Sequence, residues 1–315
     1  MGEIISVPKT SVVITTYNGE KYINELLDSI LYQSVCADEV IIMDDGSTDQ
    51  TVNIVSNYIQ TNELSTWTLK INKKNLGWKK NFKMGFDLAS GDLIFPCDQD
   101  DVWDLDKIRK MSVVMNDNAW INVLVTNYKI LIEGESRLLG YNRIEKTMLN
   151  NNELLHIKFD EKWAYTKRPG CTFCFRKTFY EEICKSWDIK YAHDSILWRQ
   201  AIIRNSLGLL QCPLIFFRRH GNNATSNIRL TRKEREDDCC KTRDSYMEFS
   251  TIAKKLNDYE KLSIIDEGIQ FLNSRIDFLK KRSVLGWLKT QVKYNRHYLY
   301  RTSALRDLIY IIKHK

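Results

Sequence analysis

Apolar runs alternate with helical patterns through the first hundred residues, and this alternation limits the folds that the chain can adopt. Runs typical of strands occupy residues 10–15, 38–44, 66–72 and 91–97, and segments with apolar residues at helical spacing separate them. Strands that alternate with helices form mostly parallel sheets with helices on both faces. We therefore predict an α/β fold built on a mostly parallel sheet.

Polar segments follow three of these runs directly. TTYNGE follows the first run, DDGSTD the second and DQDD the fourth. In open α/β sheets, ligands bind outside the carboxyl ends of the strands. We therefore expect the three polar segments to gather at one edge of the sheet and to form a binding site there.

Three acids, Asp98, Asp100 and Asp101, lie within four positions of each other after the fourth run. Hard divalent cations such as Mg²⁺ take oxygen ligands and are commonly held by one or two carboxylates and a substrate phosphate. The alternative is that the acids cap the helix that follows. Capping needs only one or two of them, so we favour a site for a metal ion and a diphosphate.

The acids after the second run, Asp44 and Asp45, have two interpretations. A carboxylate there can accept hydrogen bonds from a base or a ribose, or it can close a turn. Ser47 and Asp49 suffice as caps for the next helix, which leaves Asp45 for a ligand. Neither the glycine-rich dinucleotide fingerprint nor the P-loop motif is present, which disfavours both of those nucleotide-binding classes.

Two further candidates stand at the ends of predicted elements. His193 and Asp194 open a predicted helix, where an aspartate commonly serves only as a cap. His220 follows a predicted strand, and a single histidine is more often structural than a ligand. Position alone gives neither of them a catalytic role.

The cysteines indicate a reducing compartment. Cys171 and Cys174 make one C-x-x-C in a segment that we read as a strand, where their side chains would point to opposite faces and bind a metal poorly. Buried, reduced thiols in a cytosolic protein are the better interpretation. We see no secretory signal and no apolar stretch of the ~18–20 residues that a membrane span requires.

The pattern changes near residue 225, where strand signals end. We predict an α/β domain of residues 1–225 and a helical, basic extension of residues 226–315. Residues 278–315 hold ten Lys or Arg and one acid, Asp307, so this segment carries +9 of a chain whose net charge is +7. Taken as one helix, residues 284–299 separate an apolar, aromatic face from a basic face, which favours an anionic membrane surface. The alternative is that the apolar face packs on the α/β domain. A nucleic-acid partner is disfavoured because no binding module is present.

Together, these segments resemble an inverting family 2 glycosyltransferase of the GT-A fold, of the type found in bacterial polysaccharide biosynthesis. The resemblance covers roughly residues 9–225 and is carried by these segments in order: SVVITTYNGEKYINELLDSILYQS, DDGSTDQT, NLGWKKNF, DQDDVW, GCTFCF, HDSILW and RRHGNNAT. The Q-x-x-R-W motif of processive members is missing, which argues against a polymerising synthase.

The resemblance implies a role for each matching position. Asp194 would be the general base, and Asp100 would bind Mn²⁺ or Mg²⁺, with His220 as a further ligand of the metal or the diphosphate. Asp101 would contact the donor or cap the helix after it. The remaining positions would bind the nucleotide sugar: Thr15, Tyr17 and Glu20 around the nucleotide, Asp45 at the base, and Asp98 at the ribose or the sugar.

The resemblance also implies a function. A single sugar would pass, with inversion, from a nucleotide-diphosphate sugar to a saccharide acceptor linked to a polyprenyl diphosphate. A UDP-hexose donor is favoured, and dTDP-rhamnose is the alternative. The enzyme would work in the cytoplasm, at the inner face of the cell membrane. A protein of this fold that binds nucleotide sugars without catalysis is the less favoured alternative.

Overall fold

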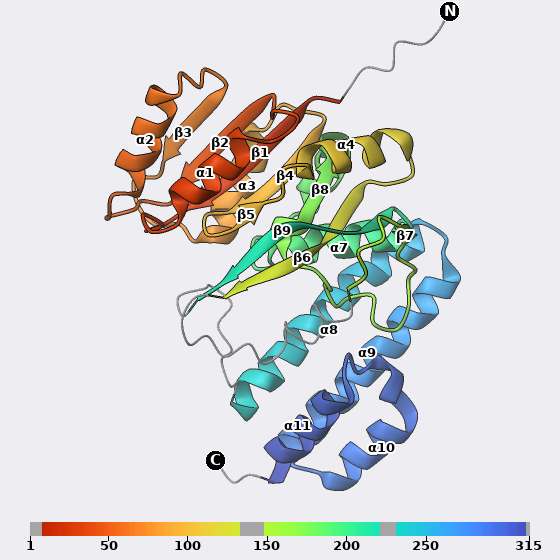
Figure 1. Ribbon diagram of the computed structural model, residues 1–315. Coiled ribbons are helices and arrows are strands. Elements are labelled where there is room, and N and C mark those ends of the chain that lie inside the picture. The colour runs from red at the N-terminus through yellow and green to blue at the C-terminus, as the bar shows by residue number, and fades with distance from the viewer. Residues whose placement is uncertain (1–7, 133–147, 221–230, 313–315) are drawn as a thin grey trace, which may run out of the picture. The chain divides into compact units, whose positions relative to one another are not determined.

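The computed structural model describes residues 8–132, 148–220 and 231–312, and the chain divides into two compact units (Figure 1). The first unit comprises residues 1–157 and 166–224, and the second comprises residues 158–165 and 225–315. The short segment 158–165 thus belongs with the C-terminal helices, which the sequence pattern did not indicate.

The first unit is built on a sheet whose N-terminal half is parallel. Its strands run in the order β3-β2-β1-β4, and the helices α1, α2 and α3 connect them in the chain. The bounds are β1 Thr10–Thr16, α1 Ile23–Leu31, β2 Glu39–Asp44, α2 Thr51–Thr61, β3 Trp67–Ile71, α3 Trp78–Leu88 and β4 Leu93–Asp98. Right-handed crossovers place α1 and α2 on one face and α3 on the other, because the strand order reverses after β3.

The other half of the sheet is mixed. Beyond β4 the order is β8-β6-β9-β5; β8 is antiparallel to both of its neighbours, whereas β6 and β9 are parallel. The bounds are β5 Val102–Trp103, α4 Lys107–Asp117, β6 Val123–Ile132, β7 Leu154–His156, η1 Gly170–Thr172, β8 Phe173–Arg176, α6 Lys177–Ile183, η2 Cys184–Ser186, α7 His193–Ile203 and β9 Leu207–Arg219. The predicted α/β class is confirmed.

Two local predictions are wrong. The runs GLLQ, residues 208–211, and PLIFFRRHG, residues 213–221, read from the sequence as two short strands, but residues 207–219 form one continuous strand, β9. The strand tolerates Pro213, which lacks an N–H group, because Pro213 lies opposite Asn127 where the β6–β9 register shifts. Cys171 lies in the 3₁₀ turn η1 and not in a strand, so Cys171 and Cys174 do not alternate across a sheet.

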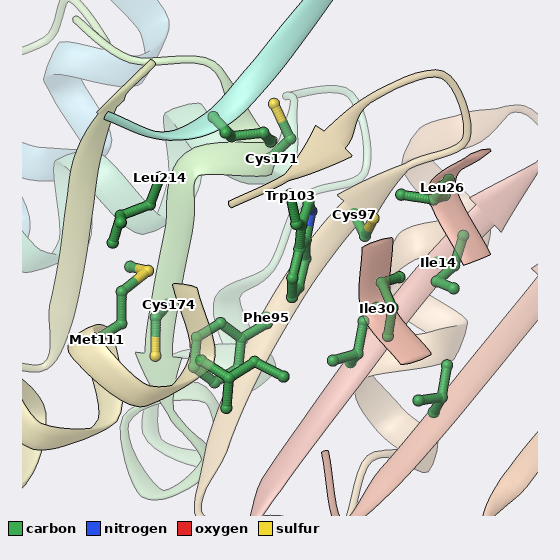
Figure 2. Close-up of a cluster of buried hydrophobic side chains, with 14 of the residues drawn as sticks. Ile14, Leu26, Ile30, Phe95, Cys97, Trp103, Met111, Cys171, Cys174 and Leu214 are labelled. Atoms are coloured by element: carbon green, nitrogen blue, oxygen red, sulfur yellow. The ribbon is translucent and has the colours of Figure 1, made fainter. Parts of the chain in front are cut away.

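The main core lies under the face of the sheet that α1, α2 and α4 cover. Alternate residues of β1 and β4, such as Ile14, Phe95 and Cys97, point into it and pack with Trp103 and Met111 (Figure 2). On the opposite face α3 packs close to the sheet, since a Cβ at Gly85 would lie 2.4 Å from Val13 Cγ1. The sheet is therefore covered on both faces, as predicted.

The second unit is helical. Its elements are α8 Arg232–Lys255, α9 Tyr259–Lys281, α10 Val284–Tyr294, η3 Asn295–His297 and α11 Arg301–Ile312. The predicted continuous helix over residues 284–299 is wrong, because α10 ends at Tyr294 and a 3₁₀ turn brings His297 and Tyr298 against Phe271. Among the described helices, none is long and apolar enough to cross a membrane.

Candidate active site

The predicted gathering of the polar segments at one sheet edge is confirmed. Thr15 lies beside Asp98 in the β1–β4 pair, and Thr16 lies beside Asp44 in the β1–β2 pair. The three strands therefore end together, and the segments TTYN, DDGS and DQDD continue from adjacent positions.

Gln99 joins two of these segments. Its side-chain amide accepts a hydrogen bond from the Tyr17 N–H at 2.8 Å and donates one to the Tyr17 carbonyl at 3.0 Å. Gly19 faces the same amide, and a Cβ there would lie 2.3 Å from Gln99 Oε1. Gln99 thus fixes the loop after β1 against the acidic turn. The sequence analysis missed this role, although Gln99 stands inside the acid cluster and Gly19 inside TTYNGE.

The acids of DDGS are used within the protein. Asp44 is fully buried and accepts hydrogen bonds from the Thr16 hydroxyl and from the Ser47 N–H. Asp45 is also buried, and its carboxylate accepts from the Asn72 amide at 2.9 Å and from the Leu76 and Gly77 N–H groups at 2.8 Å. Asp45 therefore anchors the loop before α3, and a contact with a nucleotide base would have to share an oxygen with these donors.

The three predicted residues around the nucleotide lie in different surroundings. Thr15 is buried at the end of β1, and Tyr17 is 44% exposed beyond it. Glu20 is exposed and accepts a hydrogen bond from the Gln50 N–H at 2.9 Å, which ties it to the start of α2. Tyr17 and Glu20 are therefore accessible to a ligand, whereas Thr15 is buried.

The capping alternative for the acid cluster is excluded by the position of α4. This helix begins at Lys107, and its N-cap position is Asp106, so none of the three clustered acids caps it. Asp101 is 1% exposed and accepts a hydrogen bond from the Arg218 N–H at 2.9 Å, which links the turn to β9. Burial, followed by the charges of Asp100 and Asp98, raises the pKa of Asp101 well above its usual range.

Asp100 faces His220 across the sheet edge. Asp100 Oδ2 lies 2.8 Å from His220 Nε2, and both side chains are partly buried. The His220 ring stacks on Tyr22 at 4.9 Å, and the Arg218 guanidinium lies over the same Tyr22 ring. Arg218 Nε also donates to the Asp100 carbonyl at 2.7 Å. The two predicted metal ligands are thus brought together and held by neighbouring side chains.

Asp194 lies in the first turn of α7, and its charge acts on Asp98. Burial, followed by the charges of Asp100 and Asp194, raises the pKa of Asp98 to about 7. The pKa of Asp194 itself is raised by burial, although the Ser195 N–H and the charge of Arg199 act in the opposite direction. The predicted base and the acidic turn therefore belong to one electrostatic site.

The family model described as "Glycosyl transferase family 2" matches residues 11–184, which is more than half of the chain. The chain belongs to glycosyl transferase family 2. This family 2 member is 28% identical over 224 residues to an uncharacterized glycosyltransferase of Haemophilus influenzae, covering 70% of this chain and 68% of that one.

Two relatives of this family 2 chain have more specific names. It is 29% identical over 258 residues to the dTDP-rhamnosyl transferase RfbG of Shigella flexneri, covering 78% of this chain and 85% of the relative. It is 25% identical over 225 residues to the poly(ribitol-phosphate) beta-N-acetylglucosaminyltransferase TarS of Staphylococcus aureus, covering 69% and 37%. The crystal structure of TarS residues 1–349 with UDP-GlcNAc matches with a TM-score of 0.61 at 20% identity, covering 97% and 82%. At that identity the likeness shows the shared GT-A fold.

Two sets of side chains in this family 2 chain offer donors to a metal ion. Ligand atoms of Asp98, Asp101 and Cys171 lie within 4.8 Å of one another. Lys107 is also buried there: its Nζ donates to the Cys171 carbonyl at 2.6 Å, and a buried cation disfavours a metal ion beside it. Asp100 and His220 are partly exposed, and the Asp100 carboxylate is the type of ligand that suits Mn²⁺ or Mg²⁺, with the His220 imidazole nitrogen beside it.

Proposed function

We propose that this protein transfers a single sugar, with inversion, from a nucleotide-diphosphate sugar to a saccharide acceptor. The observation that carries the proposal is the juxtaposition at one sheet edge of the acidic turn, the Asp100–His220 pair and Asp194. Such an edge can hold a diphosphate leaving group and a base for the acceptor hydroxyl at the same time. Membership of family 2 supports the same reaction class.

The chemistry assigns different tasks to the two sides of this edge. Asp194 would take the proton from the acceptor hydroxyl as that hydroxyl attacks the sugar, and a positioned base contributes typically 10²–10⁴-fold. A single displacement inverts the configuration, so a second carboxylate nucleophile is not needed. A divalent ion held by Asp100 and His220 would supply positive charge to the departing diphosphate. Asp98 would contact the ribose or the sugar.

The donor is proposed to be a UDP-hexose. The activity named for TarS, that of a beta-N-acetylglucosaminyltransferase, and the UDP-GlcNAc in its crystal structure support this choice. The activity named for RfbG, that of a dTDP-rhamnosyl transferase, supports dTDP-rhamnose as the alternative. The acceptor is proposed to be a saccharide on a polyprenyl diphosphate, used in cell-surface polysaccharide biosynthesis at the cytoplasmic face of the membrane.

Mass spectrometry of the products from a panel of nucleotide sugars tests the proposal. The protein is incubated with Mn²⁺, each donor and a lipid-diphosphate sugar acceptor. We expect one donor to give a product that is heavier than the acceptor by one sugar residue. Chelation of the metal should abolish that product, and returning Mn²⁺ should restore it.

Substitutions separate an enzyme from a non-catalytic nucleotide-sugar-binding protein. Asp194→Asn should lower kcat by about 10²–10⁴-fold while donor binding persists, and Asp100→Ala should lower it as well. Asp117→Asn, at an exposed position of α4, is the matched control. If Asp194→Asn and Asp100→Ala both kept full transfer activity, this mechanism would be wrong. Donor binding without any product would favour the non-catalytic alternative.

A further inference from the structure

The helix α10 exposes an apolar stripe in the second unit. Val284, Leu285, Leu288 and Val292 are 45%, 62%, 48% and 87% exposed, and their spacing places them on one side of the helix. The buried residues of α10, Thr290 and Tyr294, lie on another side. The stripe is therefore not needed to pack α10 within its own unit.

A second stripe lies on α11. Leu305, Ile309 and Ile312 are 55%, 41% and 59% exposed and recur at helical spacing. The two helices are joined by a hydrogen bond of 2.9 Å from Trp287 Nε1 to the Ala304 carbonyl. Trp287 thus bonds within the unit, and the side chains of the two stripes are aliphatic.

The charges that α10 itself carries are positive. The sequence of α10 contains no acid, and the single acid of residues 278–315, Asp307, is fully buried with Arg235 and Arg275. Lys289 and Lys293 are exposed on the side of α10 next to its stripe. An aliphatic stripe bordered by exposed lysines, with no exposed acid in the described part of residues 278–315, is complementary to an anionic bilayer surface.

We propose that the second unit binds the surface of an anionic lipid bilayer, with α10 lying in the interface plane and its stripe inserted among the acyl chains. Leu285, Leu288 and Val292 would contact the acyl chains. Lys289 and Lys293 would supply the electrostatic attraction to the anionic surface of the proposed membrane partner. This binding does not depend on catalysis. A second copy of the chain is the competing occupant of the stripe.

Flotation of the full chain with vesicles tests the proposal. The vesicles consist of phosphatidylcholine alone or of phosphatidylcholine mixed with phosphatidylglycerol. We expect binding to the anionic vesicles that weakens as salt is added. Lys289→Gln with Lys293→Gln should weaken this binding by about thirtyfold, because each basic residue near the surface contributes about 1 kcal/mol.

Substitutions in the stripe provide the second arm of the test. Leu288→Glu with Val292→Glu should reduce the bound fraction at least about tenfold. Val113→Glu, at a 52% exposed position of α4, is the control and should float like the wild type. Circular dichroism verifies that each variant is folded. Equal flotation of the stripe variant and the control would overturn the proposal.

Size-exclusion chromatography tests whether a second copy of the chain, and not a membrane, covers the stripe on α10. A wild-type dimer that Leu288→Glu with Val292→Glu converts to a monomer, without vesicle binding by either form, would assign the stripe to a second copy and overturn the membrane proposal. Transfer to a soluble acceptor is measured on the same preparations. A variant that no longer floats but still transfers sugar supports the docking role, whereas a chain that floats but never transfers would contradict only the proposed function.

Discussion

Asp194, the proposed base, illustrates how neighbouring groups set the pH range in which a carboxylate is deprotonated. Burial raises the pKa of its carboxyl, and the charge of Arg199 is among the groups that lower it. A carboxylate base works only when it is deprotonated, so a higher pKa moves the loss of activity on acidification to higher pH. Arg199→Gln should therefore shift the acid limb of the kcat–pH profile to higher pH.

Arg199→Lys is the matched control because it retains the charge. Its acid limb should stay near that of the wild type, as measured by transfer rates across the acidic range under saturating donor and acceptor. A limb that moved equally in the two variants, or that moved to lower pH in Arg199→Gln, would show that Arg199 does not act through the ionisation of Asp194.

His193, the residue before Asp194, is a buried imidazole in an aromatic environment. Its ring lies 4.1 Å from the Phe82 ring and 6.0 Å from the Trp78 ring, and a Cβ at Gly170 would lie 2.2 Å from its Nε2. Neither ring nitrogen has a hydrogen-bond partner among the residues that the structure describes. His193 therefore fixes the start of α7 by packing in its neutral form.

The pH dependence of stability should report this burial. Burial lowers the pKa of His193 to about 3, so the unfolded chain binds a proton between about pH 6.5 and 3 that the folded chain does not. Stability is therefore lost as the pH falls through that window, by about 2 kcal/mol at pH 5. Urea denaturation measures the free energy of unfolding at neutral pH and at pH 5. Between these two pH values, His193→Phe should lose about 2 kcal/mol less of this free energy than the wild type. Identical losses in the two proteins would contradict this account.

The contact between Gly19 and Gln99 joins two elements, the loop after β1 and the turn after β4. Gly19→Ala would force its new Cβ against the Gln99 amide, which would then lose its hydrogen bonds to Tyr17. We expect Gly19→Ala to destabilise the wild type and to cost much less in a Gln99→Ala background. The coupling should be about 1–3 kcal/mol in a double-mutant cycle measured by urea denaturation. Additive effects would show that the two elements do not constrain each other through this contact.

The sequence predicted those elements whose pattern is local. The run from Thr10 to Thr16 and the helix over Ile23–Leu31 have the expected periodicity, and the common edge follows from parallel pairing. The continuity of β9 through Pro213 depends on an irregularity in the neighbouring strand β6, which no local pattern of β9 contains.

The acid cluster shows that, at the site too, contacts with distant parts of the chain cannot be predicted from a local sequence pattern. The carboxylates of Asp98, Asp100 and Asp101 are close in sequence, yet Asp100 and Asp101 have different partners, and both partners come from one strand far along the chain. Asp101 is bound by the backbone of β9, and Asp100 by His220 at the end of that strand. The sequence identified the cluster but could not divide its members between ligand binding and structure. The segment after His220 that completes RRHGNNAT lies outside the described residues.

At the scale of the whole molecule, the second unit has its own polar centre, which makes its stability separately testable. Asp307 is fully buried and accepts hydrogen bonds from Arg275 Nε at 2.7 Å and from the Tyr298 hydroxyl at 2.8 Å, and it also pairs with Arg235. Burial opposes its ionisation, but the charges of Arg275 and Arg235 outweigh burial and lower the pKa of Asp307. This pairing therefore stabilises the unit above the unfolded pKa of about 3.9, and the contribution is lost as the pH falls through the lower folded value.

Asp307→Asn should destabilise the second unit by about 3–5 kcal/mol at neutral pH, because two buried guanidinium groups lose their counter-ion. Asp277→Asn is the control: its carboxylate is 58% exposed and pairs with Lys281 on the same helix, so its loss should cost less than about 0.5 kcal/mol. Denaturation followed by circular dichroism gives the two values, and hydrogen exchange of the α9 amides locates the change. Because the network lies wholly within the second unit, faster exchange in Asp307→Asn should be confined to α8, α9 and α11 and absent from β1 and β4. Equal stability of the two variants would show that this network does not hold the helices together.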